Sequence, residues 1–132
     1  IFPSWEKYHL TIEKLDEFAG NKTNVINCAG KLTLKEELAL ISNLRVMLSM
    51  DSGNAHIASM LGVKVVSLWG ATHPYAGFAP FYQPKENALV PDTIKYPNLP
   101  TSIYGKKIVV GYEDVMRTIL PEVVVQKIIQ NL

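Results

Sequence analysis

The sequence has little cysteine, little net charge and no long hydrophobic run, and each scarcity argues against a class of protein. A chain whose single cysteine is Cys28 cannot form an internal disulfide, which suits a reducing compartment. Thirteen Lys and Arg against twelve Asp and Glu give a net charge of +1 without a basic tract, so nucleic-acid binding is not expected. Apolar runs such as residues 123–125 are far shorter than the roughly 20 residues that a bilayer span requires, so we expect a soluble, cytoplasmic protein.

Several catalytic signatures are also missing. The sequence has no Gly-x-x-x-x-Gly-Lys-Ser/Thr loop, no Gly-x-Gly-x-x-Gly, no Cys or His cluster with zinc spacing and no Gly-x-Ser-x-Gly. These absences argue against an ATPase, a dehydrogenase, a zinc enzyme and a serine hydrolase. We therefore expect neither a cofactor nor a metal.

The length of 132 residues suits one domain with its own core. The chain starts at Ile1 without an initiator Met or a signal-peptide pattern, so we expect a domain truncated at its N-terminus. A truncated domain can carry a binding site while the catalytic partner lies elsewhere. Binding and catalysis therefore have to be argued separately.

The first half of the chain alternates between apolar runs rich in β-branched residues and segments with helical spacing. Such alternation with short loops predicts an α/β fold with a Rossmann-like parallel sheet and flanking helices. The expected elements are a helix over 5–19, a strand over 24–28, a helix from Leu34 to about Asn43 opened by a Thr33–Glu36 capping box, a strand over 45–50, a helix over 54–61 and a strand over 63–69.

The second half is punctuated by prolines and has little periodicity. Residues 88–90 suit a short strand, residues 112–119 a short helix, and Pro121 the first position of a final helix. Long ordered loops in a compact domain tend to be functional. We expect this segment to face a ligand or another domain.

The most informative segment runs from Asp51 to His56, where an apolar strand passes directly into a helix. Ligands of open α/β sheets bind outside the carboxyl ends of the strands, and a helix N-terminus there attracts phosphate. Main-chain N–H groups of residues 53–55 could hold a diphosphate, with the hydroxyl of Ser52 beside them. Asp51 accepts hydrogen bonds only, which suits sugar hydroxyls, and His56 could donate to a phosphate or a leaving oxygen. Asp-Ser-Gly is also a common cap and turn, and a lone His is more often structural, so spacing alone does not decide.

Two further loops follow predicted strands. Gly70 and Thr72 could contact phosphate or sugar, although Gly70 could equally just end a strand. Leu32 could pack on a nucleobase, although a plain capping loop explains Thr33 equally well.

Three blocks in order, GKLTLKEELALI (30–41), MDSGNAHIA (50–58) and GVKVVSLWGATHP (62–74), resemble the C-terminal domain of family 9 glycosyltransferases. This family includes the ADP-heptose:lipopolysaccharide heptosyltransferases. The resemblance is strong over residues 25–78 and weaker over residues 116–132. Asn54 and Ala71 are ordinary variations, but residues 82–112 depart from the family and leave the donor sugar and the acceptor open.

The resemblance implies a GT-B arrangement of two Rossmann-like domains, of which this chain is the nucleotide-sugar-binding half. It implies that Asp51, Ser52, Gly53 and His56 are donor-site residues, that Leu32 lies at the adenine, and that transfer inverts the anomeric carbon without a metal. The general base, the acceptor site and a Gly-rich loop with an acidic ribose contact would belong to parts upstream of Ile1.

The resulting hypothesis is the donor-binding domain of an inverting glycosyltransferase that moves a sugar, for example heptose from ADP-heptose, onto a lipid-linked lipopolysaccharide-core acceptor. It implies a cytoplasmic location, with the parent protein peripherally associated with the inner face of the inner membrane. The alternatives are a nucleotide-sugar binding module without transfer activity and one half of a sugar-nucleotide epimerase.

Overall fold

The computed structural model describes residues 17, 20, 22–107 and 109–132. The chain divides into two compact units, residues 1–37 and residues 38–132, each of which is described by itself. The helix expected over residues 5–19 lies outside the described residues, except for Glu17, which is helical.

The strand expected over residues 24–28 is wrong, because the structure has turns and irregular backbone there. The backbone groups of this segment bond locally instead of in a ladder: the Ala29 N–H donates to Oδ1 of Asn27 at 3.0 Å, and the Lys31 N–H donates to the Cys28 carbonyl at 3.1 Å. The side chain of Ile26 is 83% exposed. β-branched residues favour a strand only where they can pack on a sheet, and the described residues of this unit form no sheet.

Helix α2 (Leu34–Ser42) confirms the predicted helix and its capping box. The Glu36 carboxylate accepts from the Thr33 N–H at 2.8 Å and from the Thr33 hydroxyl at 2.7 Å, and the Glu36 N–H donates to Oγ1 of Thr33 at 3.4 Å. The backbone bond from Thr33, followed by the hydroxyl bond, lowers the pKa of the Glu36 carboxyl below its usual value of 4.5.

The capping box should make the start of α2 sensitive to acid. A lowered folded-state pKa stabilises the folded state fully above the unfolded value of 4.5, and this contribution is lost as the pH falls through the folded pKa. Glu36→Gln cannot titrate, so we expect the wild type to be the more stable of the two at about pH 6 and this advantage to shrink at about pH 3. Thermal unfolding at both pH values measures it, with Glu37→Gln in the same turn as the control. An advantage of equal size at both pH values would contradict the assignment.

The second unit contains a three-stranded parallel sheet, which confirms the predicted α/β class. Its strands β1 (Val46–Met50), β2 (Lys64–Leu68) and β3 (Ala88–Leu89) lie in the order in which they occur. Helix α3 (Gly53–Met60) connects β1 to β2, as expected for a parallel pair. The pairing runs from Val46 opposite Lys64 to Met50 opposite Leu68.

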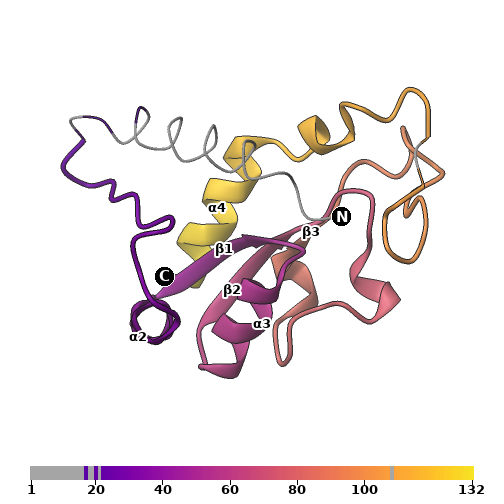
Figure 1. Ribbon diagram of the computed structural model, residues 1–132. Helices are drawn as coiled ribbons and strands as arrows, with labels where there is room; N and C mark the ends of the chain where they lie inside the picture. Colours follow the sequence, from indigo (N-terminus) through magenta and orange to yellow (C-terminus); the bar gives the residue numbers. More distant parts are fainter. Residues whose placement is uncertain (1–16, 18–19, 21, 108) are drawn as a thin grey trace. The chain divides into compact units, whose positions relative to one another are not determined.

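Helices cover the sheet on both faces, with α3 against one and α4 (Pro121–Asn131) against the other (Figure 1). The buried cluster on the α3 side consists of Ile41, Ala55, Ala58, Val63 and Val65. Small alanines on α3 let the helix approach the sheet closely. The strand-helix-strand unit is therefore the rigid part on which the loops after β1 and β2 are mounted.

Residues 70–120 are mostly loop, as predicted, with short 3-10 turns η1 (Pro74–Ala76), η2 (Lys85–Asn87) and η3 (Val115–Thr118). Gln83 ties this loop to the sheet, because its Oε1 accepts from the Val65 N–H at 2.7 Å and its Nε2 donates to the Val63 carbonyl at 3.1 Å. The Ser59 hydroxyl also donates to the Phe81 carbonyl. The side chain of Gln83 thus substitutes for a strand partner on an edge of β2 that the short β3 does not reach.

The C-terminal end of α4 is fixed by polar contacts. The amides of Asn87 and Asn131 donate to each other at 3.0 and 3.1 Å, and Asn87 is only 3% exposed. The Asn131 carbonyl accepts from Nζ of Lys64 at 2.9 Å, and the Leu132 carbonyl accepts from the Arg45 guanidinium at 2.6 Å. Cations at a helix C-terminus also interact favourably with its dipole.

Asn131→Ala should lower the free energy of unfolding because it leaves the buried Asn87 amide without its partner. We expect a loss of about 1 to 2 kcal/mol, the lower part of the range for an orphaned buried polar group, since Asn131 is half-exposed and water can enter. Urea unfolding measures it, with the neighbouring exposed Gln130→Ala as control. Adding Asn87→Ala should restore part of the loss, because both partners are then apolar. A double variant that is as unstable as the sum of the single variants would contradict the pairing.

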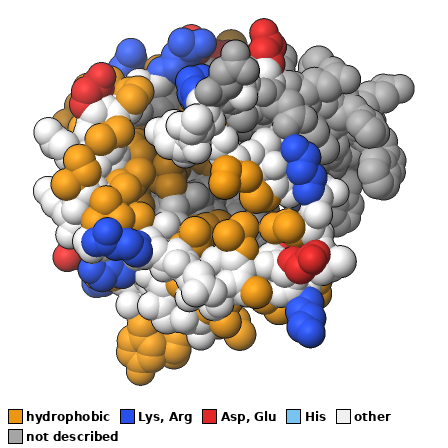
Figure 2. Space-filling view, turned by 90° about the vertical axis from the view of Figure 1, so that its left-hand side faces the viewer, with side chains coloured by type: hydrophobic (Ala, Val, Ile, Leu, Met, Phe, Trp, Pro, Cys, Tyr) orange, Lys and Arg blue, Asp and Glu red, His pale blue; other side chains and the backbone are white. Residues whose placement is uncertain are grey.

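The surface mixes apolar and charged side chains. Figure 2 shows many hydrophobic side chains on one face, with basic and acidic groups scattered among them and not gathered by sign. Leu48 and Met50 of β1 are 43% and 51% exposed, although parallel strands are normally covered on both faces. Among the described residues, no helix is long and apolar enough to cross a membrane.

Candidate functional site

The carboxyl ends of the three strands lie side by side and carry the segment that the sequence singles out. Beyond the last paired residues the ladder continues, because the Asp51 N–H donates to the Leu68 carbonyl at 3.2 Å and the Trp69 N–H to the Leu89 carbonyl at 3.0 Å. Trp69 is fully buried, so the chain leaves the sheet from a fixed point. The loops after β1 and β2 therefore start next to each other.

A side-chain hydrogen bond joins these two loops. The Thr72 hydroxyl donates to Oδ2 of Asp51 at 2.7 Å, across 21 residues of sequence. Asp51 is exposed and Thr72 half-buried. The structure thus brings together Asp51 and Thr72, two of the predicted site residues, and leaves the other carboxylate oxygen of Asp51 facing solvent.

The loop that carries Thr72 is supported from behind by residues 101–105. The Thr101 N–H donates to the Ala71 carbonyl at 3.0 Å. A Cβ atom added at Gly105 would lie 2.9 Å from Cγ2 of Thr72 and 3.2 Å from Cβ of Ala71, and the φ of +63° also favours glycine. This part of the proline-rich segment packs on the site and positions Thr72.

Helix α3 begins at the same edge and presents free main-chain donors. Ser52 is its N-cap residue, but the Ser52 hydroxyl does not cap the helix and instead lies 3.0 Å from the Ser49 hydroxyl. The Ala55 N–H donates to the Ser52 carbonyl at 3.2 Å, so the expectation that this group is free is wrong. Within the described residues, the N–H groups of Gly53 and Asn54 have no acceptor. Two donors and the positive end of the helix dipole thus face solvent.

The two glycines of the predicted site differ in their surroundings. A Cβ atom at Gly53 would meet nothing within 4 Å, so internal packing does not require a glycine there. A Cβ atom at Gly70 would lie 2.9 Å from Sδ of Met116, a contact that a shift of this flexible side chain would relieve. Gly53 leaves open space above the helix N-terminus, whereas Gly70 serves the contact with the segment before α4.

For the remaining predicted site residues, the structure gives the position but, within the part of the chain that it describes, no side-chain contact that would indicate a role. His56 is half-buried in the first turn of α3, and its ring has no hydrogen-bond partner within the described residues. Asn54 is exposed in the same turn. Leu32 is half-buried and belongs to the first unit, in the loop that leads to the capping box. The expectation that Leu32 lies at the adenine stays a prediction.

The chemistry of this edge suits a polar anionic ligand with hydroxyl groups. Free N–H groups at a helix start bind phosphate oxygens, and a carboxylate a few residues away accepts from hydroxyls. Among the described residues, no group of three or more His, Cys, Asp or Glu could hold a metal ion. The donors here are main-chain amides and hydroxyls.

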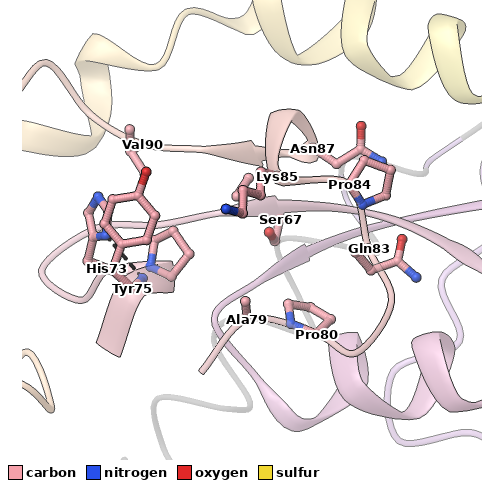
Figure 3. A pocket seen from close by; sticks show the side chains of 12 residues that line it. Ser67, His73, Tyr75, Ala79, Pro80, Gln83, Pro84, Lys85, Asn87 and Val90 are labelled. Carbon is pink, nitrogen blue, oxygen red and sulfur yellow. Dashed lines mark hydrogen bonds between the residues drawn. The ribbon is translucent and has the colours of Figure 1, made fainter. Parts of the chain in front are cut away.

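A pocket that is open to solvent and partly lined by the loop after β2 was missed by sequence reasoning. It has a volume of about 230 Å³ and lies between the end of β2, η1 and the η2–β3 segment (Figure 3). His73 at its mouth follows Thr72 directly and is not free in solvent, since its Nδ1 accepts from the Tyr75 N–H at 3.2 Å. No local pattern could reveal this pocket, because Ser67 on β2 meets residues 79–90 only after the loop has folded back over the sheet.

Removing the hydroxyl of Thr72 tests whether its bond organises the site. If this edge binds the nucleotide-sugar that the sequence resemblance implies, Thr72→Val, which keeps the shape, should weaken that binding by roughly fivefold, the effect of losing one hydrogen bond that holds Asp51 in place. Thr72→Ser keeps the hydroxyl and should bind nearly as well as wild type in the same calorimetric titration. Equal affinities for Val and Ser variants would show that the bond has no part in binding.

Comparison with known proteins identifies the family of this chain. The family model of glycosyltransferase family 9 (heptosyltransferase) matches residues 4–108, more than half of the chain. The chain is 48% identical over 48 residues to the lipopolysaccharide core heptosyltransferase OpsX of Haemophilus influenzae. This aligned segment covers 36% of the chain and 14% of that protein. It is 37% identical over 62 residues to lipooligosaccharide heptosyltransferase 2 of the same organism, covering 47% of the chain and 16% of that protein. No solved structure matches. The family match includes both strand-end loops and α3, and on this ground the chain belongs to glycosyltransferase family 9.

Proposed function

We propose that this chain is the donor-binding domain of an inverting glycosyltransferase, and that the full protein transfers a sugar from a nucleotide diphosphate to a lipopolysaccharide-core acceptor. The family match and the two relatives named as heptosyltransferases support this reading. Heptose carried by ADP is the donor we propose first. A lipid-linked acceptor would place the full protein at the inner face of the inner membrane.

One observation carries the proposal: the Thr72–Asp51 hydrogen bond lies next to the free N–H groups at the start of α3. A diphosphate accepting from Gly53 and Asn54 would lie at the positive end of the helix. Its attached sugar would then be within reach of the Asp51 carboxylate, whose free oxygen can accept from a sugar hydroxyl. Ser52, at the turn between them, can donate to phosphate.

In this arrangement the chain assists the departure of the nucleotide. An acceptor hydroxyl oxygen bonds to the anomeric carbon from the opposite face while the bond from that carbon to the diphosphate oxygen breaks, which inverts the configuration. The leaving diphosphate gains negative charge, and fixed N–H donors at α3 stabilise it. The proton of the acceptor passes to a base that the family resemblance places in the other domain. We also propose that His56, in the first turn of α3, donates to the leaving diphosphate.

Calorimetric titration of the chain with ADP, UDP and GDP, and then with ADP-heptose, tests donor binding. We expect ADP to bind most tightly of the three nucleotides and the sugar to add affinity. No binding of any nucleotide diphosphate would contradict the proposal, and so would sugar transfer catalysed by this chain alone.

The two alternatives are separated by assaying the full protein with its donor and a lipopolysaccharide-core acceptor. A transferase consumes both and releases the nucleotide diphosphate. An epimerase changes the sugar without an acceptor, and a binding module leaves both reactants unchanged.

A further inference from the structure

The pocket between β2 and the loop over residues 73–90 has a composition that the proposed donor site does not use. Twelve residues line it, and none is Asp or Glu. Lys85 contributes an ammonium group that makes no ion pair within the described residues. The pocket is therefore positively charged and has no acidic group to neutralise it.

The other polar groups at the pocket are also hydrogen-bond donors. The Ser67 hydroxyl accepts from the Trp69 indole at 2.9 Å, so its own hydrogen can be donated, and in Figure 3 it points from β2 toward Ala79 and Pro80. Nδ1 of His73 accepts from the Tyr75 N–H at 3.2 Å, so the neutral ring carries its proton on Nε2. A ligand that fits these groups must supply acceptors.

The potential acceptors at the back of the pocket are already occupied. Asn87 is paired with Asn131 through both the oxygen and the nitrogen of its amide, and the Gln83 amide bonds the backbone of Val63 and Val65 through its nitrogen and its oxygen. The side chains that still have a hydrogen to donate are thus Lys85, Tyr75, Ser67 and His73. All four can donate, and one is charged.

The size and walls of the pocket indicate a single ring. A cavity of about 150 Å³ is known to hold benzene, so about 230 Å³ leaves room for one six-membered ring with polar substituents. The walls are largely apolar, with Pro74, Pro80 and Pro84 among them. The Tyr75 ring stands at the mouth, 4.5 Å from the His73 ring, and such flat faces pack well on the C–H face of a sugar. In Figure 3 the amine nitrogen of Lys85 is turned toward the side where Tyr75 and His73 stand.

We propose that this pocket binds a monosaccharide unit that carries a phosphate or a carboxylate group. Lys85 binds the anionic group in a charge-assisted hydrogen bond, Tyr75 packs against the ring, and Ser67 donates to a ring hydroxyl. The site does not depend on the proposed function, since none of these residues belongs to the strand-end cluster around Asp51. Because His73 follows Thr72, an occupant would lie directly behind the loop that holds Asp51.

The test is a titration of the full chain with glucose 6-phosphate and with glucuronate, followed by the amide NMR signals of the chain. We expect the signals of Tyr75, Lys85 and Asn87 to shift, and neutral glucose to bind at least about tenfold more weakly than the better of the two anions. Whichever of glucose 6-phosphate and glucuronate binds more tightly shows whether the pocket prefers a phosphate or a carboxylate. Shifts confined to Gly53 and Asn54, or no shifts, would overturn the proposal. If inorganic phosphate bound as tightly as the sugar phosphate, the sugar ring would contribute nothing to binding, and the proposal that the pocket holds a sugar would be wrong.

Two variants assign the effect to the pocket. Lys85→Gln should weaken binding of the charged sugar about tenfold or more, whereas Lys35→Gln, at another exposed lysine, should not. Ala79→Leu narrows the pocket without changing its charge and should weaken binding of charged and neutral sugars alike. If both pocket variants bind like wild type, the proposal is wrong. Gly53→Val separates the two sites, because it should abolish ADP binding and leave the sugar phosphate signals unchanged.

Discussion

Asp51→Asn should remove the affinity that the sugar adds to a nucleotide diphosphate. The carboxylate accepts from Thr72 at 2.7 Å and can accept from a sugar hydroxyl with its other oxygen, whereas an amide offers one acceptor and one donor. Hydrogen bonds to charged groups contribute about 1.5 to 3 kcal/mol, so we expect ADP-heptose to bind roughly 10-fold to 100-fold more weakly. ADP alone should bind as well as before or slightly better, because a negative charge near the diphosphate is removed. Calorimetry with both ligands measures the difference.

Asp114→Asn is the matched control for this variant. Asp114 is also an exposed aspartate with one short side-chain contact, 2.7 Å from Nε of Arg117, and such surface pairs contribute little. We expect unchanged affinity for both ligands. If Asp51→Asn weakened ADP and ADP-heptose by the same factor, Asp51 would act on the fold or on the nucleotide, and its role as the sugar contact would be wrong.

Gly53→Val should abolish nucleotide binding while leaving the fold intact. The added side chain meets no atom within 4 Å in the free protein at its Cβ position, so we expect the free energy of unfolding to change by less than about 0.5 kcal/mol. In the complex the same side chain would occupy the space through which a diphosphate approaches the free N–H groups of residues 53 and 54. ADP and ADP-heptose should both bind at least roughly 100-fold more weakly, since both contacts and the helix-dipole interaction are lost.

A graded series makes this prediction sharper. Gly53→Ala should give an intermediate loss, and Glu122→Val, in the exposed first turn of α4, should give none. Urea unfolding of each variant separates binding from stability. A valine variant that binds ADP normally would mean that phosphate does not approach α3 at Gly53.

The two proposed sites differ in chemistry, and whether they influence each other can be tested. The strand-end cluster offers neutral N–H donors and a carboxylate, whereas the pocket behind it offers a lysine and no carboxylate. A nucleotide-sugar suits the first and an anionic sugar suits the second. If occupancy of the pocket shifted the loop that carries Thr72, it would alter donor affinity, and the two titrations described above would then depend on each other.

Many of the helices and strands follow from local patterns. The capping box at Thr33 and Glu36, the β-branched runs of β1 and β2, and Pro121 at the start of α4 each act within a few residues of chain. These elements depend only on residues that are close together along the chain, so the sequence was enough to predict them. The segment over residues 24–28 could not, because a strand also needs a neighbour, and its Asn27 and Cys28 bond to the next turn instead.

By itself, the sequence determined the alternation of strands and helices, the carboxyl-end position of Asp51 and of the loop after β2, and the resemblance that the family match confirms. Only the tertiary structure decided that Gly105 has no room for a side chain, that Thr72 bonds Asp51, and that Lys85 and Tyr75 line the same pocket. The physical reason is distance along the chain. Contacts across tens of residues depend on how the proline-rich loop folds back over β2, and Gln83, Thr101 and Gly105 fix that path through bonds and close packing that no local pattern predicts.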